Sequence, residues 1–328
     1  MELAKLFALA ENCRLCPRQC GVNRLAGARG FCRAGNTLLV SYCGKHDGEE
    51  PPISGRAGSG TVFLGHCTMA CVFCQNWQIS RGPVSPAAAP DEKNPAEPHG
   101  RLDKKNILKA LTPAELAAEF LKLQKSGAHN INLVSPTQYA PWIMQAVATA
   151  RQNGLSIPIV YNTNGYERAE VLELLGGLVD IYLPDLKYAS AKSAEKYSHT
   201  PDYPENARAA IKIMLKQKGL LQTRADIATQ GIIVRHLVLP GLAAESKKIL
   251  DWLSALEPRL SLSLMSQYAP QDKARQIPEL NRRLPPAEYN EVVEYAARLG
   301  LSNVWTQEAS SQEILVPDFR RESPFNNL

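Results

Sequence analysis

The chain carries, after an apolar run at residues 61–64 that predicts a strand, the stretch Gly65-His66-Cys67-Thr68-Met69-Ala70-Cys71-Val72-Phe73-Cys74-Gln75-Asn76-Trp77. Three cysteines stand in it at the spacing Cys-x-x-x-Cys-x-x-Cys, and no cysteine follows Cys74. Three thiolates on one loop can hold three corners of a 4Fe–4S cluster, since soft sulfur ligands favour such clusters, zinc or copper(I). One iron would then lack a protein ligand, and an open metal position is typical of catalytic sites. Zinc or a few buried thiols are the alternatives.

The triplet resembles the signature of the radical S-adenosylmethionine (SAM) superfamily, which places an aromatic residue, here Phe73, just before the third cysteine. Within it, the chain resembles a divergent branch of the proteins related to pyruvate formate-lyase activating enzyme. That resemblance comes from Glu50-Pro51-Pro52-Ile53-Ser54-Gly55, Gly58-Ser59-Gly60-Thr61 and Cys74-Gln75-Asn76-Trp77-Gln78-Ile79-Ser80. It implies that Cys67, Cys71 and Cys74 bind a 4Fe–4S cluster whose open iron is chelated by the amino and carboxylate groups of SAM. It also implies that the reduced cluster cleaves SAM to a 5′-deoxyadenosyl radical.

A second cysteine group lies near the N-terminus, at Cys13, Cys16, Cys20 and Cys32, with glycines between its members. Glycine permits the tight turns that would aim four sulfurs at one centre, and four ligands would close that site. The spacing suits zinc as well as a second iron–sulfur cluster, and unliganded thiols are the third interpretation. Cys43 is left over in an expected strand at residues 38–43, where we expect it in the core.

Composition and charge exclude several classes of protein. Hydrophobic residues make up 45% of the 328 residues and charged residues 21%, as in a globular protein. No run of eighteen apolar residues predicts a membrane span, and a net charge of +5 gives no strong nucleic-acid signal. Residues 1–11 predict a short amphipathic helix without a signal-peptide core, and the cysteines are confined to residues 13–74. We therefore expect a cytoplasmic protein.

Beyond residue 110, segments typical of helices and strands alternate. The expected helices are 112–126, 141–152, 168–175, 205–217, 244–256 and 286–299, and the expected strands are 130–134, 157–161, 179–183, 231–239, 260–265 and a short 304–305. With the strand at 61–64 this makes six strands plus a short seventh, an α/β fold whose sheet is parallel. That is too few strands for a closed eight-fold barrel, and the family resemblance implies an open partial (β/α)6 barrel.

Three segments are expected along the chain. Residues 1–60 form a cysteine-rich metal-binding segment and a linker, 61–275 the partial barrel, and 276–328 a C-terminal helix, short strand and tail. Residues 82–106 are rich in proline and predict an exposed insertion, which could fold over the site as a lid.

Polar residues gather after five successive strands, where a parallel α/β sheet places its reactive groups. Such a mixture suits SAM, whose ammonium needs acceptors and whose carboxylate and ribose need donors. The expected SAM-binding residues are Phe73, Ser135, Thr137, Asn162, Asn164, Asp185 and Lys187. His236, inside an apolar run, is expected to be a hydrogen-bonded core residue instead.

The activating-enzyme proteins contain sequence motifs similar to Thr163-Asn164-Gly165, Asp185-Leu186-Lys187 and Leu239-Pro240-Gly241. The resemblance implies that Asp185 and Lys187 help to hold SAM. Two places differ. The family has a Gly-Gly-Glu whose glutamate receives the SAM ammonium, whereas this chain has Val134-Ser135-Pro136-Thr137, so we expect Ser135 or Thr137 as the substitute. Ala269 stands where the family has a histidine.

Three functions are compatible with these residues. The first is hydrogen abstraction from a protein glycine, which would make the protein an activase of a glycyl-radical enzyme. The second is radical SAM chemistry on a small molecule or on another position of a macromolecule. Both make the protein an oxidoreductase that needs a flavodoxin- or ferredoxin-type reductant, and the first also needs a protein substrate. The third is a zinc-binding scaffold without catalysis. No catalytic residue beyond the cofactor ligands is predicted.

Overall fold

A single mixed sheet organises the fold. The computed structural model describes residues 2–81, 107–308 and 311–325. Its strands follow the order β10-β9-β8-β6-β5-β4-β2-β1-β3, and β7 pairs with β8 outside this path. Their bounds are β1 (Leu38–His46), β2 (Ser59–Leu64), β3 (Lys109–Leu111), β4 (Ile131–Val134), β5 (Ile159–Thr163), β6 (Ile181–Pro184), β7 (Gln222–Arg224), β8 (Ile227–Leu237), β9 (Ser261–Met265) and β10 (Val304–Thr306).

The barrel is open and its strands are mostly parallel. Within the described residues, the strands β2, β4, β5, β6, β8, β9 and β10 form a continuous parallel series. No ladder in this part of the chain joins β10 to β3, so the sheet is not closed. The α/β fold, the six strands with a short seventh, and the partial barrel are thereby confirmed.

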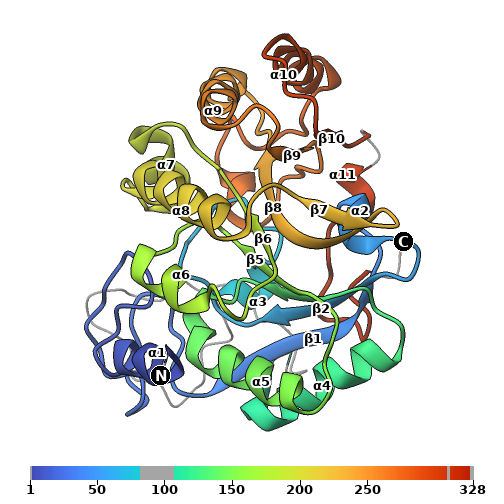
Figure 1. Cartoon of the computed structure of the whole chain (residues 1–328). Helices are drawn as coiled ribbons and strands as arrows, with labels where there is room; N and C mark the ends of the chain where they lie inside the picture. Colours follow the sequence, from blue (N-terminus) through green and yellow to red (C-terminus); the bar gives the residue numbers. More distant parts are fainter. Residues whose placement is uncertain (1, 82–106, 309–310, 326–328) are drawn as a thin grey trace.

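Helices cover the outside of the curved sheet, where they follow one another in an arc (Figure 1). They are α4 (Pro113–Lys125), α5 (Ala140–Gln152), α6 (Ala169–Leu175), α8 (Tyr203–Lys218), α9 (Ala243–Leu256) and α10 (Pro286–Arg298). The predicted start of α4 is confirmed, because Thr112 and Glu115 form a reciprocal capping box there. No helix in the described ranges is both long enough and apolar enough to cross a membrane.

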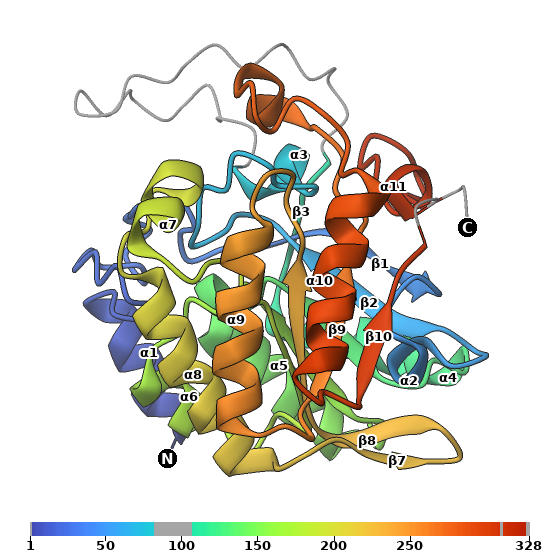
Figure 2. The same cartoon turned by 90° about the horizontal axis from the view of Figure 1, so that it is seen from above.

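The inner face of the sheet is apolar at one end of the strands and polar at the other. Val160, Ile181, Leu183 and Ile233 form a cluster with Ile53 of the short helix α2 (Pro51–Ser54). This cluster fills the inside of the sheet below the carboxyl ends of the strands. Figure 2 shows α3 (Trp77–Ser80) near one end of the strands and the β7–β8 hairpin near the other.

Both flanking segments of the chain contribute strands to the sheet. β1 from the first sixty residues pairs antiparallel with β2 and with β3, and β10 from the last segment pairs with β9. α1 (Glu2–Glu11) packs on α5, where the rings of Phe7 and Trp142 meet edge to face at 5.6 Å. The division into residues 1–60, 61–275 and 276–328 stays a prediction.

Several local expectations were wrong. β5 begins at Ile159 instead of residue 157, because Pro158 has no N–H to donate to the ladder. The linker expected at the end of residues 1–60 contains α2, and residues 59 and 60 already belong to β2. α7 (Ala191–Ser198), the β7–β8 hairpin and α11 (Ser311–Ile314) were not predicted. The proposed lid at 82–106 lies outside the described residues.

Candidate active site

The three-cysteine loop leaves β2 at its carboxyl end and runs into α3. A tight turn within it is closed by the N–H of Cys74, which donates to the carbonyl of Cys71 at 3.2 Å. The side-chain amide of Gln138 donates to two carbonyls at the start of the loop, at 2.9 and 3.1 Å. Held in this way, Cys67, Cys71 and Cys74 line one cavity at the strand ends.

The sulfurs of Cys67 and Cys71 accept hydrogen bonds from the surrounding protein. The Asn164 amide donates to the Sγ of Cys67 at 3.4 Å, and the backbone N–H of Met69 donates to the same atom at 3.5 Å. The hydroxyl of Ser198 donates to the Sγ of Cys71 at 3.0 Å. Hydrogen bonds to sulfur orient and tune the thiolates that hold iron–sulfur clusters.

The three cysteines do not converge on a single metal ion in the described structure. Burial, with a contribution from the neighbouring Cys71, raises the pKa of Cys74 to about 12, so its proton leaves only in exchange for a positive centre. In the described part of the chain, no three histidine, cysteine, aspartate or glutamate side chains stand close enough to hold one metal ion. Each thiolate of a 4Fe–4S cluster binds a different iron, so its cysteines stand farther apart than the ligands of one zinc ion.

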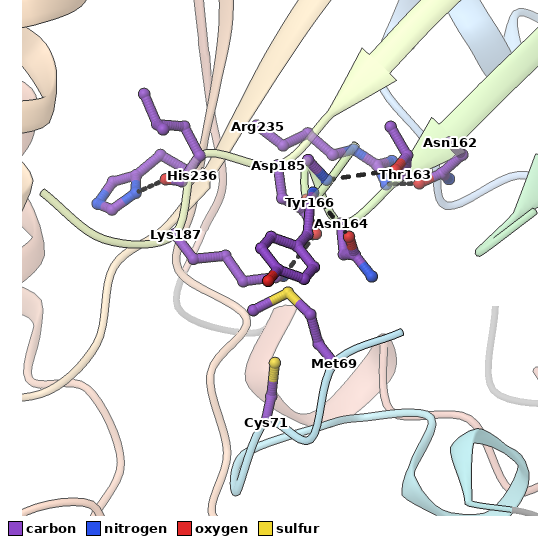
Figure 3. Close-up of polar contacts among 12 residues, drawn as sticks. Met69, Cys71, Asn162, Thr163, Asn164, Tyr166, Asp185, Lys187, Arg235 and His236 are labelled. Atoms are coloured by element: carbon purple, nitrogen blue, oxygen red, sulfur yellow. Dashed lines mark hydrogen bonds and ion pairs between the residues drawn. The ribbon is translucent and has the colours of Figure 1, made fainter. Parts of the chain in front are cut away.

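A buried ion pair faces the same cavity from the end of β6. The Lys187 ammonium lies 2.5 Å from the Asp185 carboxylate, and the two side chains are 16% and 20% exposed. Burial alone would lower the pKa of Lys187, but the charge of Asp185 raises it above its ordinary value, so the ammonium stays protonated. The Tyr203 hydroxyl donates to the Asp185 carbonyl at 2.8 Å and accepts the backbone N–H of Lys187 at 3.0 Å. Figure 3 shows Lys187 reaching toward the loop that carries Cys71.

The structure brings most of the expected SAM-binding residues together, and leaves one outside. The further residues that line the same cavity are Phe73, Ser135, Asn162 and Asn164. Thr137 is not among the lining residues, because the turn η1 (Thr137–Tyr139) buries its hydroxyl, which donates to Glu167 at 2.5 Å.

Sequence reasoning missed a charged network deeper in the cavity. Arg235 donates through Nε to Glu50 at 2.7 Å and through Nη2 to the other oxygen at 2.9 Å, and it also pairs with Glu49. Its Nη1 donates to the side-chain Oδ1 of Asn162 at 3.3 Å. Burial alone would raise the pKa of Glu50, but Arg235 holds it below its ordinary value. The sequence did carry a signal, because Arg235 stands two residues after Ile233 on β8 and therefore faces the same inner side of the sheet.

His236 points away from this network, on the opposite side of β8 (Figure 3). Its ring nitrogens bond the Leu186 carbonyl at 2.7 Å and the Ser246 hydroxyl at 2.8 Å. Burial lowers the pKa of His236 to about 4, so it is neutral. Its prediction as a core residue is confirmed.

Part of the cavity wall comes from the C-terminal segment, through Leu315, Pro317 and Phe325. The N-terminal cysteine group at residues 13–32 contributes none of the described lining residues, whereas residues 46 and 48–51 do line this cavity. The cavity encloses about 1350 Å³ of empty space, part of it open to solvent.

The N-terminal cysteines lie in a separate place. Cys13, Cys16, Cys20 and Cys32 line a second, smaller cavity, and Cys43 on β1 lines neither of the two. The structure therefore groups the eight cysteines into a set of three, a set of four and one single residue, as their spacing predicted.

Comparison with known proteins places the chain in a family. A model of the radical SAM superfamily matches residues 61–253. Over 311 residues the chain is 31% identical to MJ0674 of Methanocaldococcus jannaschii, covering 93% of this chain and 79% of that protein. It is 27% identical to MJ0808 of the same organism over 188 residues, which is 53% of this chain and 49% of that protein. Both relatives are named only as uncharacterized proteins.

Solved structures with a similar fold are more distant. A domain of pyruvate-formate lyase-activating enzyme from Bacteroides vulgatus is 15% identical, with a TM-score of 0.37 over 52% of this chain and 92% of that one. Streptococcus suis SuiB bound to S-adenosylmethionine is 12% identical, with a TM-score of 0.43 over 80% of this chain and 50% of that one. Because the family match covers more than half of the sequence, the chain belongs to the radical SAM superfamily.

Proposed function

We propose that this protein cleaves SAM reductively at a 4Fe–4S cluster held by Cys67, Cys71 and Cys74, and abstracts a hydrogen atom from a substrate. The observation that most supports this proposal is the shared cavity. Three sulfurs without a fourth cysteine face the same space as the pair of Asp185 and Lys187. When bound, the cluster and SAM would supply one electron and a 5′-deoxyadenosyl radical, while the protein binds, orients and excludes water.

Lys187 and Ser135 are the residues proposed to contact SAM directly. Among the described contacts the Lys187 ammonium donates one hydrogen bond, to Asp185, so two of its three donors can serve a carboxylate or a ribose. Ser135 lines the cavity close to where the family has its glutamate, and we propose it, instead of Thr137, as the ammonium acceptor. The Asn164 amide donates to Thr68 at 2.9 Å as well as to Cys67, so it positions the cysteine loop.

The deeper part of the cavity is proposed to bind the substrate. Glu49, Glu50 and Arg235 give it buried charges of both signs, which suits a substrate with polar or charged groups. A polar small molecule and a polar protein segment both meet this description. One observation favours the activase function. Asp185 and Lys187, which match a sequence motif of the activating enzymes, line the cavity.

An external one-electron donor completes the proposal. We propose a flavodoxin- or ferredoxin-type reductant and an oxidoreductase working in the cytoplasm, where cysteines stay reduced. A zinc-binding scaffold would need neither the reductant nor SAM.

The test is to purify the protein anaerobically, load it with iron and sulfide, reduce it with dithionite and add SAM. We expect 5′-deoxyadenosine and methionine by liquid chromatography and mass spectrometry, formed slowly even without substrate. A colourless protein with one zinc ion would instead support the scaffold. Absence of deoxyadenosine from protein that is fully reduced and carries its full complement of clusters would contradict the proposed function.

A further inference from the structure

The four N-terminal cysteines are arranged around one enclosed space. Cys13, Cys16 and Cys32 are buried, and together with Cys20 they line the same small cavity. A Cβ added at Gly30 would lie 2.7 Å from the Sγ of Cys20, so this glycine makes room for the thiol. The chain is thus folded so that all four side chains face this cavity, where the backbone N–H of Phe31 donates to the Sγ of Cys20 at 3.4 Å.

A buried arginine beside the sulfurs lacks a partner of opposite charge. Arg24 is 1% exposed and lines the same cavity. Its guanidinium donates to the carbonyls of Gly35, at 2.6 and 3.1 Å, and Gln138, at 2.9 Å, and no carboxylate in the described ranges pairs with it. Buried charges are normally compensated. A centre made of metal and thiolates carries negative charge and would compensate Arg24, whereas four protonated thiols would not.

The four cysteines do not converge on a single ion in the described structure, which favours a cluster over zinc. Zinc binds thiolates at about 2.3 Å in a tetrahedron, which brings neighbouring sulfurs to about 3.8 Å from one another. No three cysteine, histidine or acidic side chains among the described residues converge in this way. The cavity that the four thiols line together with seven other residues contains about 320 Å³ of empty space, part of it open to solvent. In both respects the group resembles the set at Cys67, Cys71 and Cys74, which also lines a cavity without converging on one point.

We propose that Cys13, Cys16, Cys20 and Cys32 hold a second iron–sulfur cluster, closed by four thiolates. This site lies directly beside the first one. Thr68 lines the N-terminal cavity while its neighbour in sequence, Cys67, lines the other, and the Arg18 guanidinium donates to the Thr68 carbonyl at 2.8 Å. Four thiolates leave no position for SAM, so the chemistry open to this cluster is electron exchange.

The experiment uses the full chain with Cys67, Cys71 and Cys74 all replaced by alanine, purified anaerobically. We expect this variant to keep about four irons and four sulfides per chain, an absorption band near ~400 nm and no stoichiometric zinc. The wild-type protein should hold about eight irons. A matched variant, Cys43→Ala, changes a cysteine outside both cavities and should keep the full content.

Each other outcome overturns the proposal. A triple variant that is colourless and holds one zinc ion shows a zinc site, and one that holds no metal shows free thiols. If the triple variant were to unfold, the variant Cys16→Ser in the wild-type background would decide, since it should lose about half of the iron while the first cluster remains. This result is independent of the proposed function, because iron in the triple variant is measured without SAM cleavage.

Discussion

The two cysteine groups of this protein face different surroundings. The group at Cys67, Cys71 and Cys74 opens on a large cavity that also contains charged residues from several strand ends. The group at residues 13–32 surrounds a much smaller space, whose other walls include Leu15 and Phe31. One group supplies three sulfurs and the other four.

The difference shows how ligand number and access separate two uses of the same side chain. A set of three leaves one metal position for a molecule from solution, and the polar strand ends around it can orient that molecule. A set of four satisfies every metal position and needs no polar neighbours except groups that balance its charge, the role that we propose for the buried Arg24. The following predictions test this contrast.

Replacing Cys67, Cys71 and Cys74 by alanine should have the largest effect. The variant should form no 5′-deoxyadenosine, because SAM has no open iron to bind, while iron bound by the N-terminal group is retained. Product formation is measured by mass spectrometry on the reduced protein. Deoxyadenosine formation at the wild-type rate in this variant would show that the open site is elsewhere.

Arg235→Met should destabilise the open cavity strongly, because it leaves Glu50 buried without its partner. Removing one member of a buried ion pair typically costs about 3–5 kcal/mol of the free energy of unfolding. Urea denaturation under anaerobic conditions measures this cost. As a control, Lys122→Ala removes an exposed ion pair with Glu119 and should change the stability little. Equal effects of the two substitutions would argue against a buried charged network.

Lys187→Ala should weaken SAM binding and leave iron content unchanged. The loss of a charge-assisted hydrogen bond is about 1–3 kcal/mol, or about 5–150-fold in the dissociation constant. Isothermal titration with SAM measures it, and Lys192→Ala on the exposed side of α7 is the matched control. Iron loss in Lys187→Ala would instead assign this residue to cluster assembly.

Cys16→Ser should have the smallest effect on SAM chemistry and a local effect on folding. Loss of metal should free the segment at residues 13–32 to open, and limited proteolysis there should accelerate about tenfold, which corresponds to about 1.4 kcal/mol. Cys43→Ala should not change the cleavage rate at this segment. An unchanged cleavage pattern in Cys16→Ser would mean that the four cysteines are ordinary thiols.

Much of this arrangement could be predicted from the sequence because the signals are local. The period of apolar residues placed the parallel strands, and the rule for strand ends brought Asn164, Asp185 and Lys187 to the cavity that the cysteines line. The capping box at Thr112 fixed a helix start to the residue. The roles of Asn164, Asp185 and Lys187 toward SAM remain predictions.

What could not be predicted depends on contacts between distant segments. Arg235 and Glu50 form an ion pair although they are 185 positions apart in the sequence, and no local sequence pattern predicts such a pair. Thr137 stands two residues from Ser135, yet η1 turns its hydroxyl into the core toward Glu167. Phe325 lines the cavity because the C-terminal segment folds back to it, and this depends on the tertiary fold instead of a local sequence pattern.

The most direct test of the contrast between an open and a closed site is electron paramagnetic resonance of the reduced protein, with and without SAM. We predict that SAM shifts the signal of one cluster in the wild-type protein. In the variant lacking Cys67, Cys71 and Cys74, the remaining signal should not respond to SAM. A wild-type signal that ignores SAM, or an N-terminal signal that shifts with it, would contradict this account.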